Sequence, residues 1–141
     1  MKRYLVEPEV AGHLGSETEL DRSVHPPTAH CLHYVMDGWL GDPLLESFPC
    51  FVLTADCAEK LRKAELTGVH FAEVKISVSE QFEETCPNII LPKFKWMRIV
   101  GDISDDFALA GDGRLIVSGR GLDLLQDSGM ANAEVSDTVT E

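Results

Sequence analysis

The feature that most constrains this fold is a pattern that occurs twice. Residues 51–54 and 115–118 are each three apolar residues followed by a hydroxyl residue. A leucine, a glycine and an Ala-Glu-Val triplet then follow in the same order, at Leu61, Gly68 and 72–74 and again at Leu125, Gly129 and 133–135. Each copy reads as a strand, a helix capped by the hydroxyl, a glycine that ends the helix, and a second strand. We predict two degenerate repeats, 51–78 and 115–135, although this order of elements also arises without duplication.

The rest of the chain predicts short strands and turns. We expect strands at 4–6, 31–36, 71–78 and 91–100, and a hairpin in which residues 111–113 join 107–110 to 114–118. Residues 11–30 read as loop, 42–46 as the start of a helical turn, and 79–85 as an acidic loop or helical turn. The segment after Gly129 holds no Lys, Arg or aromatic residue and is expected to form an edge strand, with 136–141 as a frayed tail.

These elements predict the fold class. A chain of 141 residues fits one domain. We expect a single α+β domain, with a mixed, mostly antiparallel sheet and two or three short helices.

The charge of the chain bears on its partners. Twenty-four Asp and Glu against twelve Lys and Arg give a net charge of −12. Such a field repels nucleic acids and anionic membranes and attracts basic proteins, so neither nucleic acid nor membrane is an expected partner. No apolar run approaches the ~20 residues that span a bilayer. The apolar stretch at 4–6 is too short for a signal peptide, which predicts a cytoplasmic protein.

Histidine and cysteine suggest a metal site or a small enzyme. His30, Cys31 and His33 are residue types that zinc prefers, and Cys31 with His33 forms a candidate dyad. In a strand, however, His30 and His33 point to opposite faces. The four cysteines form no CxxC pair and are expected to be small buried residues. We therefore predict no catalytic residue, no metal and no cofactor, and keep these three residues as the alternative site.

Acidic residues offer a different kind of site. They gather in two loops that bracket the 91–100 strand, as Glu80, Glu83 and Glu84 and as Asp102, Asp105 and Asp106. Either group can hold Lys and Arg of a partner, and an aromatic residue such as Trp39 can anchor it.

The repeat also carries a family resemblance. The phrase from 52–54 through Leu-Thr-Gly at 66–68 to Phe71 resembles a motif of small immunity proteins encoded beside bacterial polymorphic toxins. The second copy, from 116–118 to Gly129, matches it more weakly, and the resemblance covers about half the chain. It implies a protein that blocks a cognate toxin by binding it. Some relatives carry paired CxxC motifs, which this chain lacks, so no zinc site is carried over.

The leading hypothesis is thus a cytosolic, acidic protein-binding module, an immunity protein for a basic toxin domain or another basic protein. The alternatives are a small enzyme or metal-binding protein that uses His30, Cys31 or His33, and a structural or regulatory subunit of a larger assembly. Both a monomer and a homodimer that pairs through an exposed strand edge remain open.

Overall fold

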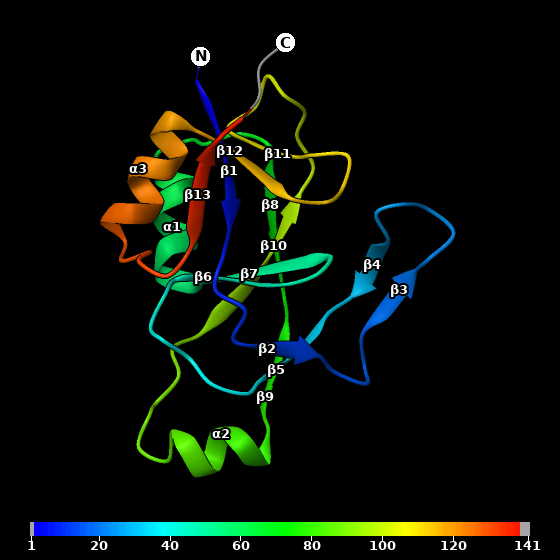
Figure 1. Cartoon of the computed structure of the whole chain (residues 1–141), viewed down its shortest axis with the longest axis vertical. Coiled ribbons are helices and arrows are strands. Elements are labelled where there is room, and N and C mark those ends of the chain that lie inside the picture. Colours follow the sequence, from blue (N-terminus) through cyan, green and yellow to red (C-terminus); the bar gives the residue numbers. More distant parts are fainter. Residues whose placement is uncertain (1, 139–141) are drawn as a thin grey trace.

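Two four-stranded antiparallel sheets, each with one helix packed on it, form the larger part of the molecule (Figure 1). The computed structural model describes residues 2–138. The first sheet has the order β6 (Leu44–Ser47), β7 (Cys50–Thr54), β10 (Phe94–Ile99), β8 (Val69–Ala72). The second has the order β11 (Phe107–Leu109), β12 (Leu115–Ser118), β1 (Arg3–Glu7), β13 (Glu134–Asp137). Helix α1 (Ala55–Lys63) follows β7 and helix α3 (Gly119–Asp127) follows β12, and the two helices contact each other.

The two sheets are built alike, residue for residue. In each sheet, a hairpin (β6–β7 or β11–β12) leads into a helix (α1 or α3) and then into a further strand (β8 or β13). That strand does not pair with the hairpin, because a strand from another part of the chain (β10 or β1) lies between them. Trp96 of β10 pairs with Val52 and Ala72, and Leu5 of β1 pairs with Ile116 and Ser136. Equivalent residues from β7 and β12 onward are therefore 64 positions apart, as Thr54 and Ser118 are.

We call β6, β7, α1 and β8 the first unit, and β11, β12, α3 and β13 the second unit. The strand that lies inside each sheet is exchanged between the two units. Strand β1 precedes the first unit in the chain but lies inside the second sheet, and β10 precedes the second unit but lies inside the first. Each sheet is thus completed by a strand from ahead of the other unit. The two halves form one domain, and neither contains a complete sheet of its own.

The main core reflects the same equivalence. Fourteen of its fifteen buried residues form seven pairs, in which the two residues occupy the same position in the two sheets, in their helices or just after them. The remaining residue, Cys57, corresponds to the buried Gly121. The pairs are Val6 with Met97, Leu44 with Phe107, Phe51 with Leu115, Leu53 with Val117, Ala58 with Leu122, Leu61 with Leu125, and Leu66 with Met130. Each unit supplies half of a shared core, which explains why the sequence pattern recurs.

The ends of the helices correct part of the predicted repeat. The hydroxyls of Thr54 and Ser118 do cap α1 and α3, accepting bonds from the amides of Cys57 and Gly121. Both helices end in a Schellman motif, in which Leu66 N donates to Leu61 O and Met130 N to Leu125 O. The left-handed residue is Gly129 in the second motif but Glu65 in the first. Gly68 is therefore not the helix cap, and the two Ala-Glu-Val triplets are not structurally equivalent.

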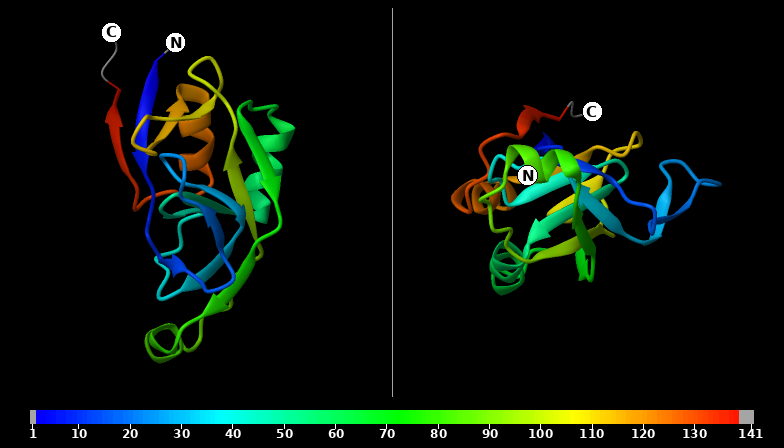
Figure 2. Two further views of the ribbon diagram at one scale, coloured as in Figure 1. Left: turned by 90° about the vertical axis from the view of Figure 1, so that its right-hand side faces the viewer. Right: turned by 90° about the horizontal axis from the view of Figure 1, so that it is seen from below.

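A third layer covers the other face of the first sheet. Strands β2 (Gly12–Leu14), β5 (His33–Met36) and β9 (Lys75–Val78) form a small sheet in which β5 and β9 are parallel. A second core cluster joins this layer to alternate residues of β7 and β10, including Val52, Phe94 and Trp96. Strands β3 (Glu19–Asp21) and β4 (Thr28–Cys31) form a hairpin that projects to one side (Figure 2).

The mixed, mostly antiparallel α+β architecture agrees with the prediction, and several local predictions were wrong. Residues 11–30 contain three short strands, β2 to β4, instead of a continuous loop. The expected helical turn at 42–46 is largely strand β6. The single strand expected at 71–78 is two strands in different sheets, β8 and β9. Strand β13 includes residues 136 and 137, which were expected to fray, and 139–141 lie outside the described residues.

Candidate functional site

The structure separates the predicted acidic residues into two unlike groups. Glu80, Glu83 and Glu84 lie on α2 (Glu80–Thr85), at the lower end of the molecule in Figure 1. Asp102, Asp105 and Asp106 lie in the loop between β10 and β11, at the upper end. One partner surface therefore does not include both groups unless it spans the long axis of the molecule.

The carboxylates of the β10–β11 loop already have partners within the chain. Asp102 accepts bonds from the amide and hydroxyl of Ser104 at 2.8 and 2.6 Å, and Asp105 accepts one from the amide of Asp102 at 2.9 Å. Asp106 is buried, with 4% of its surface exposed. Its place in the interior removes it from an exposed acidic surface, contrary to its role as a partner-binding candidate.

The carboxylates of α2 are free by comparison. Phe82 anchors the helix in the second core cluster, and the Ser79 hydroxyl caps it by accepting a bond from the Phe82 amide. Glu80, Glu83 and Glu84 are exposed, and none forms an ion pair with a cation among residues 2–138. No basic residue lies in the last turn. Like charges three or four positions apart repel each other, so this helix presents an uncompensated negative charge.

Trp39 lies beside this helix in a fixed position. Its indole N–H donates to the carbonyl of Asp42 at 2.9 Å, and its ring meets Phe94 edge to face at 6.0 Å. The ring lines a hollow of about 420 Å³ to which α2 contributes Gln81. Val10 and Leu40 also line this hollow, and the two residues are 66% and 72% exposed.

A buried carboxylate holds the loop that carries Trp39 and Leu40. Glu9 accepts bonds from the amides of Leu40 at 2.7 Å and Asp42 at 3.4 Å. Burial raises the pKa of Glu9, while these two amides act in the opposite direction. Asp37 also lines the hollow, and its hydrogen bond with His13 Nδ1, at 2.7 Å, lowers the pKa of Asp37. The exposed apolar side chains therefore lie on a braced loop, which keeps them in place for a partner.

A second hollow lies against the other residues of α2. It has a volume of about 320 Å³, and α2 contributes Phe82 and Glu83 to it. Ile89 lines it and is 41% exposed, and the adjacent Ile90 is 92% exposed. We call the three glutamates of α2 together with these two hollows the α2 surface. It combines free carboxylates with apolar hollows, an arrangement suited to binding a protein that is basic and partly apolar.

The alternative residues His30, Cys31 and His33 do not converge. His30 and Cys31 are exposed on β4, whereas His33 is buried on β5. Cys31 Sγ lies 3.4 Å from the carbonyl of Glu17. Among residues 2–138, no three His, Cys, Asp or Glu side chains are placed to hold a metal ion.

His33 has one notable contact. Its Nε2 lies 2.6 Å from the hydroxyl of Ser77, and its Nδ1 accepts from the amide of Glu17 at 3.4 Å. Which of the two groups donates in the contact between His33 and Ser77 depends on the tautomer of the imidazole. The contact links the parallel strands β5 and β9.

The cysteines are in part as expected. Cys50 and Cys57 are buried, and burial raises the pKa of Cys50 to about 12. Cys31 is exposed and Cys86 half-buried.

Sequence reasoning identified Trp39 but missed the other apolar members of the α2 surface. Leu40 stands between two glycine turn signals at 38 and 41, and Ile89 and Ile90 stand between Pro87 and Pro92. A short apolar run enclosed by turn residues is equally typical of a buried strand, so the sequence alone does not mark these side chains as exposed. Their grouping around α2 depends on the tertiary fold.

Comparison with protein-family models, with curated proteins and with solved structures gave no match. Within residues 2–138, no helix is long and apolar enough to cross a membrane.

Proposed function

We propose that the protein is an acidic binding module that neutralises a basic protein by occupying its surface, as the immunity proteins of polymorphic toxin systems do. The observation that carries this proposal is the α2 surface, where unpaired glutamates adjoin exposed apolar residues. In this proposal the partner is a toxin domain rich in Lys and Arg. Neutralisation requires binding alone and no catalytic group in this chain.

Charge and apolar contact have separate roles in this proposal. The carboxylates of Glu80, Glu83 and Glu84 attract the partner and raise the rate of association, an effect that salt weakens. An apolar side chain of the partner enters the hollow beside Trp39 and slows dissociation. Because Asp42 already holds the indole of Trp39 and Glu9 holds the backbone of Leu40, binding does not have to order the Trp39 ring or this part of the loop.

The test is co-purification with the C-terminal domain encoded by the gene immediately upstream. We expect a stable complex by gel filtration and loss of the toxicity of that domain when the two are expressed together. Absence of a complex would remove the proposed function.

Two variant pairs then test the surface. Glu83→Gln with Glu84→Gln should lower the association rate constant about ten-fold at low ionic strength and reduce its salt dependence. Asp123→Asn with Asp127→Asn, on the exposed side of α3, changes the net charge equally and serves as the control. Trp39→Ala should raise the dissociation rate constant. If both double variants slow association equally, the overall charge and not the α2 surface attracts the partner.

A further inference from the structure

We propose that the outer edge of β13 is a docking site for an extended, basic strand of another protein, which extends the second sheet by one strand. This inference does not rest on the α2 surface or on the identity of the toxin. Strand β13 lies at the edge of its sheet with β1 on its inner side, and the two further views of the molecule agree (Figure 2).

The backbone groups available to such a strand follow from the register. The amide of Thr138 donates to the carbonyl of Arg3, and β1 and β13 are antiparallel with Leu5 opposite Ser136. Antiparallel pairs alternate between hydrogen-bonded and non-bonded positions. The amides and carbonyls of Ser136 and Glu134 therefore face β1, and those of Val135 and Asp137 face outward. Two N–H and two C=O groups form the edge that a new strand would bond.

Accessibility distinguishes this edge from the other strands. All four residues of β13 are exposed, whereas each of the other described strands contains at least one residue that is buried or half-buried. Proteins protect open edges with short strands, charged side chains, proline or a covering segment, and of these β13 has its short length and the negative charges of Glu134 and Asp137, which repel acidic strands. No other strand among residues 2–138 pairs with the outer side of β13. The backbone of Val135 and Asp137 is thus open to a partner strand.

The charged side chains of β13 determine which charge a partner strand should carry. Glu134 and Asp137 lie on β13. Asp137 is paired with Lys2 at 3.5 Å, whereas Glu134 is directly opposite Glu7 of β1 and forms no ion pair among residues 2–138. Like charges opposite each other on neighbouring strands are unfavourable, and a lysine or arginine beside Glu134 relieves the repulsion. A second copy of this chain paired through β13 would instead add the carboxylates of a like-charged strand, of which only Asp137 has a cation partner, Lys2. The edge therefore disfavours self-pairing and favours a strand with alternating basic residues.

The proposal is tested with the intact protein and a blocked hexapeptide of alternating lysine and valine. Residue-resolved amide hydrogen exchange, measured by NMR, should show at least about ten-fold added protection at Val135 and Asp137 with saturating peptide, because only these amides of β13 face outward. The amides of Glu134 and Ser136 should change little. A matched peptide of alternating glutamate and valine should give no added protection.

Two substitutions at one position provide the control. Val135→Pro removes an outward amide without removing a bond to β1, so the sheet should persist while the protection by peptide is lost. Val135→Ala keeps the amide and should retain the protection. A thermal unfolding midpoint of the proline variant close to that of the native protein would show that the fold is intact.

Three outcomes would overturn the proposal. One is the absence of protection at Val135 and Asp137 with the basic peptide, or protection confined to α2. Another is equal protection by the acidic peptide. The third is protection that develops without peptide and increases with protein concentration, because it would show that a second copy occupies the edge. A variant with Glu83→Gln and Glu84→Gln should respond to the peptide at β13 as the native protein does, which separates this site from the proposed function.

Discussion

Asp42 and Asp106 hold the two units together in the same way from opposite directions. Asp42 lies just ahead of β6 in the first unit and accepts the amides of Ala131 and Asn132, which follow α3 in the second. Asp106 lies just ahead of β11 in the second unit and accepts the amide of Thr67, which follows α1 in the first. Both carboxylates are buried, with 1% and 4% of their surfaces exposed. Each hairpin is thus tied to the segment after the helix of the other unit.

The first prediction concerns these two carboxylates. Asp42→Asn and Asp106→Asn should each lower the free energy of unfolding by about 2–3 kcal/mol, because the amide group offers fewer acceptors and turns a donor toward a backbone N–H. Asp106 additionally loses the charge that pairs with Arg120 at 2.7 Å. Urea unfolding followed by circular dichroism measures the change. Asp102→Asn, in an exposed loop, is the control and should change the unfolding midpoint little, because the amide oxygen of asparagine can still accept the bonds from Ser104. Equal midpoints for all three variants would contradict the proposed role of these contacts.

The second prediction compares the two helix caps. Thr54→Ala removes one bond to the Cys57 amide and should cost about 1 kcal/mol of unfolding free energy. Ser118→Ala should cost more, about 2 kcal/mol, because the same hydroxyl also donates to Asp106 at 2.6 Å. Unfolding in urea provides both values. If the two substitutions cost the same, the bond from Ser118 to Asp106 adds nothing to stability.

The third prediction uses the residues that end α1 and α3. Glu65 has a φ of +58° where the equivalent Gly129 has a φ of +108°. A side chain is strained in the left-handed region, and glycine is not. Glu65→Gly should therefore raise the unfolding free energy by about 0.5–1 kcal/mol, and Gly129→Ala should lower it by about 1 kcal/mol. Changes of the same sign in the two variants would contradict the equivalence of the two helix ends.

The sequence predicts those parts of the fold that depend on near neighbours. The hydroxyls of Thr54 and Ser118 act on amides three residues away, and the hairpin at 111–113 closes through a bond from Ala110 N to Arg114 O. Such contacts leave a local pattern of residues. The pairing of β1 with β12 and β13 joins the two ends of the chain and leaves none.

Two errors have identifiable physical causes. Residues 71–78 alternate as one strand does, but the chain passes from one sheet to another between Ala72 and Lys75, and periodicity does not record that change. Gly68 was interpreted as a helix cap because it follows α1. Glycine is required here both by a φ of +89° and by a close approach, since a Cβ at this position would lie 2.2 Å from the carbonyl oxygen of Phe107.

The candidate site was predictable only as separate parts. The sequence identifies Trp39 and the glutamates of α2 as candidates, and the structure places them together. The sequence does not distinguish the exposed Glu83 from the buried Asp106, because both lie in acidic segments between strands. The burial of the Asp106 carboxylate depends on its contacts with Thr67, Ser118 and Arg120, which come from other parts of the chain.

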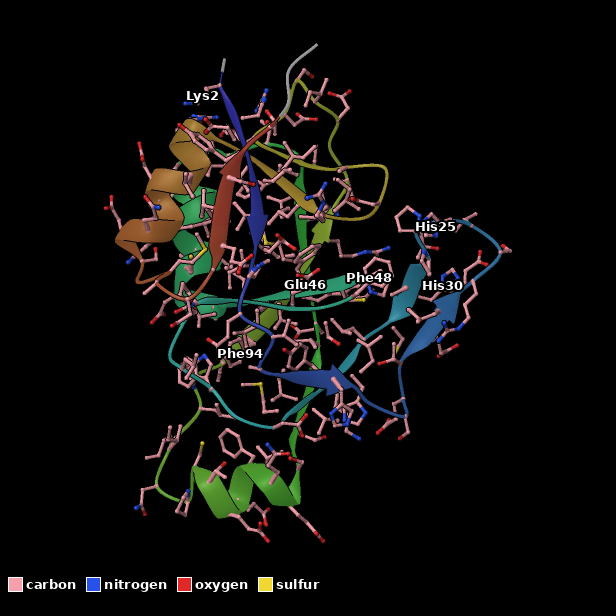
Figure 3. The ribbon with its side chains drawn as sticks, viewed as in Figure 1. Lys2, His25, His30, Glu46, Phe48 and Phe94 are labelled. Atoms are coloured by element: carbon pink, nitrogen blue, oxygen red, sulfur yellow. The ribbon has the colours of Figure 1, made fainter. Side chains whose placement is uncertain are left out.

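The last prediction concerns a carboxyl group on β6. Burial, and secondarily the nearby Glu7, raises the pKa of Glu46 from 4.5 to about 7. Figure 3 labels this residue next to Phe48, near the middle of the molecule. In the unfolded chain the group ionises near 4.5, so between that value and 7 the folded state binds more protons than the unfolded state. The contribution of Glu46 therefore makes the fold less stable as the pH rises through this window.

Glu46→Gln tests this sign directly. The neutral amide should raise the unfolding free energy by about 2 kcal/mol at pH values above the window and change it little below pH 4.5, since one pKa unit corresponds to about 1.4 kcal/mol and residual solvent access reduces the effect. Glu7→Gln removes only the repulsion between Glu7 and Glu46, so it should raise the unfolding free energy at high pH by a smaller amount. The measurement is urea unfolding at a series of pH values. A stabilisation by Glu46→Gln that is equal at low and high pH would show that packing of the amide, and not the ionisation of Glu46, is responsible.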